Sequence, residues 1–483
     1  MLLMAAAGLS AVALVWQIVS PQPLRAAGIT VDRLSAALSL LVAAVGAVTF
    51  RFSIRYMDGD PRQARFLGWM AFAVVAAFLL MLSTNLLLLV TAWSLTSVAL
   101  HQLLTHYEDR PEAIRAARKK FLISRIGDAA LLWMVLLVWS HWDTLDLHAL
   151  LAATTGQPAS AATVGVALSV VLAALTKSAQ FPFHSWLPET MEAPTPVSAL
   201  MHAGIINAGG VLLLRFAPLL VEVPAVLLSL VVAGSLTVTV GTLAMWAQVK
   251  VKRSLAWSTV NQMGFMMVQC GLAAFPAAAL HIIGHGCYKA WAFLRAGDVP
   301  AILGRAAQPV APGRTVARVA IGMLVALPAI WLATWITGFS PLHSPGEMAL
   351  AAVVALAMGQ VWAALFAKPI ADHAALGRGI TGVSVIILAT IAAFGLYRIA
   401  GTFLAPVLGD LQPVHSVSTW IAALVLVTTM VFLTVIHAML PVLGRSAGGR
   451  AFRVHALHGF YFGAVADRIV ASIWKHPKGK HHA

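Results

Sequence analysis

Residues 172–186 read LAALTKSAQFPFHSW and place a single lysine, Lys177, inside an apolar run, shortly before Pro182. A charged side chain within the hydrocarbon of a bilayer costs at least a few kcal/mol, so a lysine in such a run indicates a functional site. Proline removes a backbone donor and clashes with the preceding turn. The helix that carries Lys177 is therefore predicted to be broken beside the charge.

The composition places this stretch in a polytopic membrane protein. The chain of 483 residues is 60% hydrophobic and 10% charged, and its mean hydropathy of +0.87 excludes an ordinary soluble domain. Cys270 and Cys287 both lie in apolar segments and give neither a disulfide framework nor a paired metal motif, so redox chemistry has no support. Residues 2–19 lack a basic leader region and a clean cleavage site, and we interpret them as the first span.

Hydrophobic runs predict an all-α fold of about 14 transmembrane helices. Residues 1–440 form the predicted transmembrane domain, and residues 441–483 form a cytoplasmic or interfacial tail whose stretch 452–474 is predicted to be an amphipathic helix. The predicted spans are 2–19, 33–51, 66–83, 85–105, 121–139, 161–188, 196–217, 224–247, 254–273, 277–295, 317–338, 348–367, 379–397 and 417–440.

The net charge of +15 follows the predicted topology. Alternate connections are rich in Lys and Arg, whereas the connections at 141–160 and 337–347 contain neither. The positive-inside rule makes the basic set cytoplasmic and places both termini inside. The charge therefore reports topology and not nucleic-acid binding, with anionic lipid or an acidic partner surface as secondary interpretations. The basic set comprises Arg51, Arg55, Arg62, Arg65, Arg110, Arg115, Arg118, Lys119, Lys120, Lys250, Lys252, Arg253, Arg295, Arg305, Arg314, Arg318, Lys368, Arg378 and the cations of the tail.

Other charges lie inside the predicted spans. Arg125 and Asp128 are three residues apart on one helix, so we expect a local pair that offsets much of its own cost and has a structural or accessory role. Arg215 lies close to a helix end, where its side chain is expected to snorkel toward the interface.

His281, His285 and Lys289 repeat at helical spacing and predict one polar stripe on an otherwise apolar helix. A row of imidazoles suits proton transfer near neutral pH. Two alternatives stay open. The histidines could be hydrogen-bonded core residues, or they could bind a metal, although HIIGH lacks the acidic residue of the HExxH motif and offers no third ligand. His202, which follows the broken helix, is expected to contact Lys177 and to extend the relay.

Three stretches carry a resemblance to a known family. They are LTKSAQFPFHSWLPETMEAPTPVSALMHAGIINAGG (175–210), SLAWSTVNQMGFMMVQCGL (254–272) and HIIGHGCYKAWAFLRAGDV (281–299). They resemble the antiporter-like subunits, which include the proton-pumping membrane subunits of respiratory complex I and the Mrp sodium/proton antiporters. The resemblance covers residues 32–297. It implies two inverted five-helix repeats, each with a broken helix, and a central polar axis of Lys177, His202, His281, His285 and Lys289.

The sequence departs from the family pattern at two places. The family carries a glutamate after a tryptophan where this chain reads AWSLTS (92–97), so Ser94 occupies the position of the missing carboxylate. The second broken helix, expected within LATWITGFSPLHSPGE (332–347), offers Thr334, Thr337 and Ser340 in place of a lysine or glutamate. The first departure removes the expected counter-charge of Lys177, which is then expected to depend on His202 or on water. The second departure affects the exit half of a proton path.

The basic connection HQLLTHYEDRPEAIRAARKKFLISRIGDAALL (101–132) resembles the branch of this family found in Dab-type inorganic-carbon accumulation complexes of bacteria. That resemblance implies a multi-pass subunit of the inner membrane that moves a cation, with the proton expected first, and thereby energises bicarbonate accumulation. It also implies a soluble DabA-type partner, docked on the cytoplasmic face in a hetero-oligomer, that holds zinc and performs the hydration. This chain itself is expected to hold no cofactor and to be no enzyme. The alternatives are a respiratory or Mrp-type subunit, and a membrane scaffold with a defunct ion path.

Overall fold

The computed structural model describes residues 2–20, 22–297, 312–366, 375–409 and 415–474. The described residues are almost entirely helical, as predicted, with one short β-hairpin. The long helices are α1 (Leu2–Val19), α2 (Arg33–Tyr56), α3 (Gln63–Leu82), α4 (Leu86–Leu104), α5 (Pro111–Trp142), α12 (Pro224–Ala247), α13 (Val251–Gly271), α14 (Phe275–Leu294), α16 (Pro312–Thr337), α17 (Pro345–Leu365), α18 (Ala375–Leu408) and α19 (Val417–Leu443). The shorter elements are β1 (Leu24–Ala26), β2 (Ile29–Val31), α6 (Leu147–Thr154), α7 (Ala161–Lys177), α8 (Trp186–Glu189), η1 (Thr190–Glu192), α9 (Thr195–Ala203), η2 (Ile205–Asn207), α10 (Ala208–Arg215), α11 (Ala217–Val221), α20 (Ala447–Leu457), η4 (Gly459–Tyr461) and α21 (Phe462–Ile473).

Each predicted span overlaps a helix. Within the described residues, eleven helical segments are long and apolar enough to cross a membrane, with α9, η2 and α10 counted as one segment. α7 is apolar but shorter. α13 and α14 are not among the eleven because Ser, Asn, Gln, His and Lys side chains interrupt their apolar surface. One of these two polar helices, α14, carries the predicted polar stripe, and the total of fourteen crossings stays a prediction.

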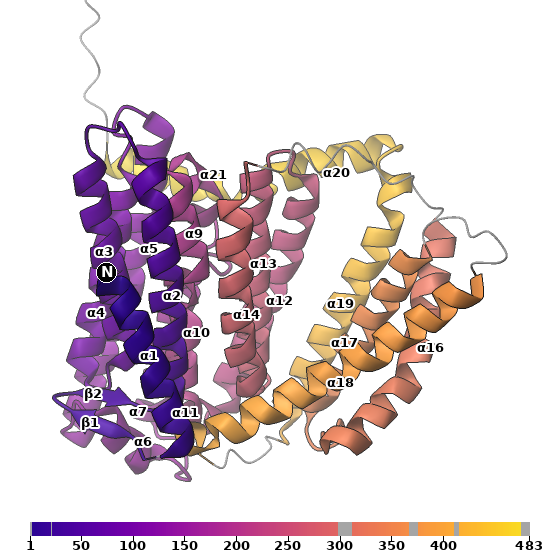
Figure 1. Ribbon diagram of the computed structural model, residues 1–483, viewed down its shortest axis with the longest axis horizontal. Helices are drawn as coiled ribbons and strands as arrows, with labels where there is room; N and C mark the ends of the chain where they lie inside the picture. The colour runs from indigo at the N-terminus through magenta and orange to yellow at the C-terminus, as the bar shows by residue number, and fades with distance from the viewer. Residues whose placement is uncertain (1, 21, 298–311, 367–374, 410–414, 475–483) are drawn as a thin grey trace, which may run out of the picture.

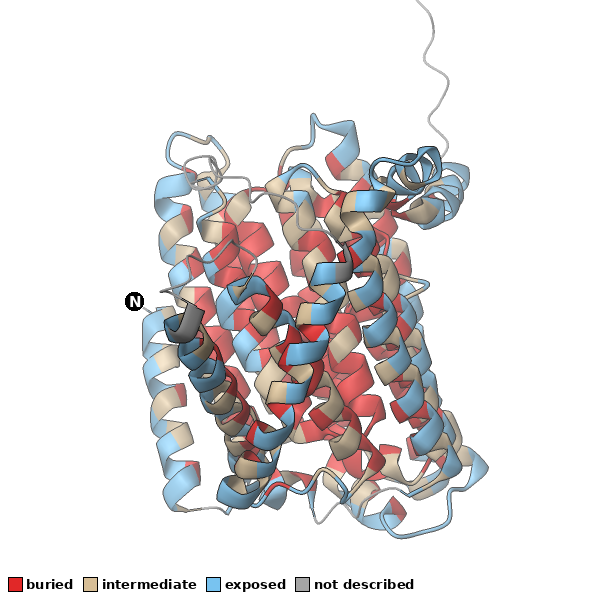
Figure 2. Ribbon diagram, turned by 90° about the vertical axis from the view of Figure 1, so that its right-hand side faces the viewer, coloured by how far each residue is buried: buried red, intermediate tan, exposed pale blue. Residues whose placement is uncertain are grey.

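The helices form two groups. α1 to α14 pack around one large apolar core, whereas α16 to α19 enclose several smaller clusters. Figure 1 shows the second group beside the first, with the tilted α18 reaching back to the lower end of the first group. Buried ribbon concentrates in the interior helices, and the outward faces are exposed (Figure 2). Those exposed faces are apolar, with Trp331 71% and Leu388 68% exposed, as expected for side chains that face lipid.

The bundle has two chemically different ends. We call one the basic end, because the predicted basic connections 57–62, 105–110 and 248–250 lie there, together with α20 and α21. The other is the hairpin end, with the β-hairpin, α6, α11 and the connection 338–344 (Figure 1). The up-and-down order of the helices thus gathers the basic connections at one end, as predicted. Arg305, Lys368 and the lysines at 475, 478 and 480 lie outside the described residues.

The boundaries of α5 correct one prediction. The fifth span was expected at 121–139, but the helix begins at Pro111, with proline in the first turn, where its missing N–H costs nothing. Lys119 and Lys120 therefore belong to the helix and not to a connection, and both are buried. Proline at the start of a helix was the sequence signal that could have revealed this extension.

The second predicted break is absent. α16 runs without interruption through Pro328 to Thr337, and the following residues 338–344 form a turn that leads into α17. Thr334 and Thr337 bond back to carbonyls of their own helix. The stretch 332–347 is therefore the end of one helix and the start of the next, and the inverted repeats stay a prediction.

The tail folds onto the basic end. α19 continues to Leu443, so the boundary predicted after residue 440 lies inside a helix. The amphipathic stretch 452–474 forms parts of α20 and α21, which lie across the upper end of the molecule in Figure 1. Asp467 of α21 pairs with the buried Lys119 at 2.7 Å, and Lys119 also pairs with Glu189 at 2.6 Å. One buried lysine thus joins the tail to the segment that follows the broken helix.

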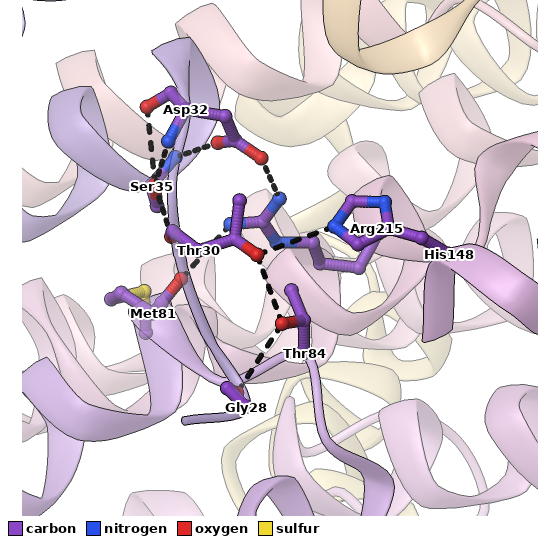
Figure 3. Close-up of polar contacts among 8 residues, drawn as sticks. All are labelled: Gly28, Thr30, Asp32, Ser35, Met81, Thr84, His148 and Arg215. Atoms are coloured by element: carbon purple, nitrogen blue, oxygen red, sulfur yellow. Dashed lines mark hydrogen bonds and ion pairs between the residues drawn. The ribbon is translucent and has the colours of Figure 1, made fainter. Parts of the chain in front are cut away.

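A buried ion pair holds the hairpin end together. Arg215 pairs with Asp32, which caps α2, and donates a second hydrogen bond to the Met81 carbonyl at 3.1 Å (Figure 3). Arg215 is only 6% exposed. The prediction that Arg215 snorkels to the interface is therefore wrong, because a carboxylate from another helix satisfies it inside the protein.

Candidate functional site

The predicted break at Lys177 is confirmed. α7 ends at Lys177, and the chain is non-helical until α8 begins at Trp186. Ala179 adopts a left-handed backbone conformation (φ 50°), which is costly for a residue with a side chain and is common at functional sites. Pro182 lies within this interval and offers no N–H for a helical hydrogen bond.

Lys177 is held by neutral oxygen atoms of α4. Its ammonium donates to Thr96 Oγ1 at 2.6 Å, to Ser97 Oγ at 3.0 Å and to the Trp93 carbonyl at 3.1 Å. It also lies 4.6 Å from the centre of the Trp93 ring. Ser94 is not among these partners. The helix on which the family carboxylate was expected therefore contacts Lys177 through the hydroxyls of Thr96 and Ser97 and not through Ser94.

A second buried lysine, Lys120, also contacts Ser97. Lys120 is 3% exposed and donates to the Ser97 carbonyl at 2.6 Å, so Lys120 and Lys177 bind two atoms of one residue. The predicted pair of Arg125 and Asp128 forms at 2.6 Å. These two side chains and Lys120 are charged neighbours of Lys177. Asp128 therefore supplies the nearby negative charge, from α5 and not from α4.

His202 belongs to a different neighbourhood from the one predicted. It is fully buried and stacks on Phe293, with ring centres 4.4 Å apart. Its electrostatic neighbours are Lys289, Lys252 and His285. The structure gives it no contact with Lys177, because α9 packs against α14, which places the imidazole beside that helix.

The stripe on α14 forms as predicted. The rings of His281 and His285 lie 5.9 Å apart, and His285 lies within hydrogen-bonding reach of the His202 backbone. Lys289 is fully buried and donates to the Leu255 carbonyl of α13 at 3.0 Å. At the other end of the stripe, His281 Nδ1 lies 3.0 Å from Gln269 Oε1. The structure therefore brings four of the five predicted relay residues into one group.

The polar residues around Lys177 and the polar residues around α14 approach each other where two helices are interrupted. Ser178, the first residue of the break in α7, donates to the Ile206 carbonyl at 2.7 Å, and Ile206 lies in the 3₁₀ turn that separates α9 from α10. Nearby, polar atoms of Ser198, His202 and Asn207 are buried without a hydrogen-bond partner in the described part of the chain. Buried polar atoms normally bind protein or ordered water. This arrangement suits a hydrated passage between Lys177 and His202.

A cavity of about 510 Å³ lies between the polar stripe of α14 and the second group of helices. Its polar lining comes from Ser258, Gln262 and Gln269 of α13 and from His281 and His285 of α14. Leu350 of α17 and Ala393 and Tyr397 of α18 form the opposite wall. The polar stripe therefore faces an open cavity between the two helix groups.

The described residues offer no cluster of three or more side chains of the kinds that bind metals. His281 and His285 remain two potential ligands without a third, and their ring contacts are with each other, Phe265 and Gln269. Cys270 is buried and Cys287 is exposed, both as free thiols.

Comparisons with known proteins agree with this geometry. Residues 83–308 match the family described as NADH:quinone oxidoreductase/Mrp antiporter, TM, and residues 26–67 match the N-terminus of chain 5 of complex I. The chain is 44% identical over 57% of its length to a probable inorganic carbon transporter subunit DabB2 of Halothiobacillus neapolitanus, covering 50% of that protein. It is 40% identical over 56% of its length to DabB of Hydrogenovibrio crunogenus, covering 52% of that protein. NADH-quinone oxidoreductase subunit L of Mycobacterium tuberculosis is 36% identical over 56% of the chain, which covers 43% of that subunit.

A solved Mrp complex from Dietzia sp. shares the fold. It superimposes with a TM-score of 0.63 at 24% identity, covering 99% of this chain and 57% of the other. The chain spans about half the length of the curated relatives it matches. The matched residues include the break in α7 and the stripe on α14. Over these residues the chain is therefore similar to the antiporter-like family of membrane subunits, and DabB inorganic carbon transporter subunits are among the proteins that it resembles.

Proposed function

We propose that this chain is a cation-translocating membrane subunit and that the cation is a proton. The observation that carries the proposal is the set of buried lysines and histidines at interrupted helices in the interior of the bundle. Lys177, His202, His285 and Lys289 are each at most 7% exposed. Burying ionisable groups in a membrane protein is costly, and such groups mark ion pathways. Imidazole binds and releases protons near neutral pH, and lysine amines change their proton affinity readily when they are buried.

The proposed route begins at the basic end. A proton reaches Lys120 and passes through water to Lys177, whose ammonium contacts the same residue, Ser97, and whose hydrogen-bond partners are neutral. It then crosses the two facing interruptions, where water bridges the unpartnered polar atoms, and reaches His202. From there it moves along His285 and His281 to the cavity. Each step places a donor near an acceptor or near buried polar atoms that bind water.

We further propose that proton movement energises inorganic carbon accumulation, because the relatives matched at 44% and 40% identity are named inorganic carbon transporter subunits. The catalytic partner in this proposal is a soluble DabA-type subunit that holds zinc and hydrates carbon dioxide, so no bond is made or broken in this chain. It docks on the basic end, which faces the cytoplasm of a bacterium whose inner membrane holds this subunit, with both termini inside. Arginine-rich surfaces such as this one pair readily with acidic partners.

The test is rescue of a carbonic-anhydrase-deficient bacterium in ordinary air by this chain together with its partner subunit. Lys177→Ala and His285→Ala are expected to abolish rescue, while Arg25→Ala and His141→Ala, which alter exposed cations or imidazoles, are expected to preserve it. Co-purification of the two subunits controls for assembly. If both Lys177→Ala and His285→Ala preserve rescue, the relay hypothesis is wrong. If they abolish rescue while the complex still assembles, the scaffold alternative is wrong.

A respiratory or Mrp-type subunit is the second candidate, favoured by the 36% identity to subunit L of M. tuberculosis. Purification of the native complex in mild detergent separates the two. Quinone-reductase or multiple antiporter subunits in that complex would support the second candidate, and a single large zinc protein would support the first.

A further inference from the structure

A cavity beneath the tail forms a binding site that the proton relay does not use. α21 packs against α5, and an apolar cavity of about 450 Å³ lies between them. We propose that this cavity takes one acyl chain of an anionic phospholipid, whose phosphate lies at the level of Arg118 and Arg468. One wall of the site is the tail, which lies outside residues 26–67 and 83–308, the parts of the chain that match known families.

The chemistry of this cavity suits a hydrocarbon chain. Its walls are apolar side chains of α5 and α21 together with residues 181–183 of the interrupted segment. Among the described residues that line it, Lys119 and Ser185 have polar side chains, and Lys119 is already paired with Glu189 and Asp467. The volume lies within the usual range of ligand pockets, roughly 300–1,000 Å³. The lining thus offers a ligand apolar contact and no unpaired charge.

The cavity opens toward the lipid-facing surface. Ile126 of α5 and Val465 and Ile469 of α21 line it, yet all three are exposed, with Val465 at 62%. Further along α5, Leu132 and Leu136 are exposed as well. Apolar side chains of an interfacial helix bury themselves in the acyl region of the bilayer. The surface that continues from the cavity along α5 is therefore one that lipid chains cover.

The length of α5 sets the depth of the site. The helix has 32 residues, so it is about 48 Å long, whereas the hydrocarbon of a bilayer is about 30 Å thick and needs about 20 residues. The exposed Trp139 lies near its other end, as is typical of an interface. About 20 residues back from this tryptophan, the hydrocarbon ends near residue 120. The boundary falls between Arg118 and Leu122, with the apolar cavity on its hydrocarbon side.

Cations gather on the headgroup side of that boundary. A second cavity, of about 880 Å³, flanks the same turn of α21 and shares Val470 with the first. Arg118, Arg468 and Trp474 line it, and the Arg118 guanidinium lies 5.5 Å from the centre of the Trp474 ring. Basic side chains at the surface of a membrane attract anionic lipids. The aromatic ring and the arginines therefore mark the level at which a lipid phosphate lies.

The carboxylates of the second cavity do not cancel its cations. Glu108 pairs with two other arginines of the basic end at 3.3 and 3.5 Å, and Asp467 pairs with Lys119. This leaves Asp109 against the three arginines of the lining, none of which lies within ion-pair distance of a carboxylate in the described part of the chain. The remaining positive charge favours an anionic headgroup over a zwitterionic one.

The experiment measures hydrogen exchange at residues 462–474 of the purified complex in mild detergent, after its lipids have been removed. Phosphatidylglycerol, phosphatidylcholine or inorganic phosphate is then added. At about ten times its half-saturating concentration, phosphatidylglycerol should slow exchange about tenfold, because a ligand that binds only docked α21 stabilises that state by mass action. Phosphatidylcholine should have a smaller effect, and inorganic phosphate should have none.

Two variants locate the two halves of the lipid. Ile126→Trp fills the cavity from its lipid-facing side, so neither lipid should slow exchange. Arg118→Gln combined with Arg468→Gln should remove the preference for phosphatidylglycerol over phosphatidylcholine. The matched controls are Leu132→Trp, at an exposed position of the same helix that does not line the cavity, and Arg450→Gln combined with Arg453→Gln in α20. Both controls should respond to lipid as the unaltered complex does.

Several results would overturn the assignment. An equal response to the two lipids in the unaltered complex would exclude selection of an anionic headgroup, and a response to inorganic phosphate alone would show a site for free anions. Absence of any response to lipid, or a full response in Ile126→Trp, would show that no chain occupies the cavity. Should Ile126→Trp loosen α21 before lipid is added, the double arginine variant decides: a retained preference for phosphatidylglycerol refutes the proposal, and a lost preference supports it.

Discussion

The hydrogen bond from Lys177 to Thr96 gives the sharpest test of how the buried ammonium is stabilised. The Thr96 hydroxyl accepts from Lys177 at 2.6 Å, shorter than the contacts of the same ammonium with Ser97 and Trp93. Thr96→Val keeps the β-branched shape and removes this acceptor. A hydrogen bond to a charged group contributes about 1.5–3 kcal/mol, and two other acceptors remain, so we expect a loss near the lower limit of about 1.5 kcal/mol.

That loss acts on the protonated lysine alone. A loss of about 1.4 kcal/mol lowers the occupancy of the loaded state about tenfold, so proton uptake at a fixed sub-saturating pH should fall by about that factor. Half-maximal uptake should also move about one pH unit to the acid side, because a destabilised ammonium needs a higher proton concentration to form. The assay is the pH dependence of proton uptake in proteoliposomes.

Thr91→Val is the matched control, because Thr91 lies on the same helix, is exposed and bonds only within its own turn. Uptake with an unchanged pH profile in Thr96→Val, in a complex that assembles and melts normally, would refute the idea that α4 hydroxyls stabilise the charged lysine. An equal effect in Thr91→Val would point to helix distortion as the cause.

Two predictions concern stability. Asp32→Asn keeps a residue that caps a helix equally well but leaves the buried Arg215 without its counter-charge, so the free energy of unfolding in detergent should fall by about 3–5 kcal/mol. Asp146→Asn, an exposed capping aspartate of α6, should leave it nearly unchanged, and equal losses in the two variants would contradict the argument. Gly209→Ala places a Cβ 2.3 Å from the hydroxyl that opens the break in α7, so thermal stability and proton uptake should both fall. Gly68→Ala is the control: its added Cβ meets no atom within 4 Å, so the substitution should be neutral or stabilising by about 0.5–1 kcal/mol. Unchanged thermal stability and proton uptake in Gly209→Ala would show that the two helix interruptions do not pack closely.

The features that sequence alone predicted are local ones. Apolar runs identified the helices, proline beside Lys177 identified the break, and helical spacing placed His281, His285 and Lys289 on one face. Arg125 and Asp128 paired as their spacing indicated. All these inferences depend on residues within about one or two turns of each other, where the geometry of a helix fixes the distances.

The partners of those residues were decided by packing. Ser97 is eighty positions from Lys177 in the sequence, and nothing in a helical pattern says that both Lys177 and Lys120 meet it. His202 was expected beside Lys177 and instead stacks on Phe293.

Packing also decided the partner of Arg215 and the lining of the cavity. Sequence reasoning assigned Arg215 to the interface, but Asp32 reaches it from another helix. It expected a second broken helix within 332–347, whereas α16 continues unbroken to Thr337 and the wall of the cavity opposite His281 includes Tyr397 of α18. The sequence by itself determined which segments are helices, where one of them breaks and which polar groups enter the membrane. Only the tertiary structure decided which of those groups face one another, because the rotation and tilt of each helix follow from how its side chains interlock with those of its neighbours across long separations in the chain.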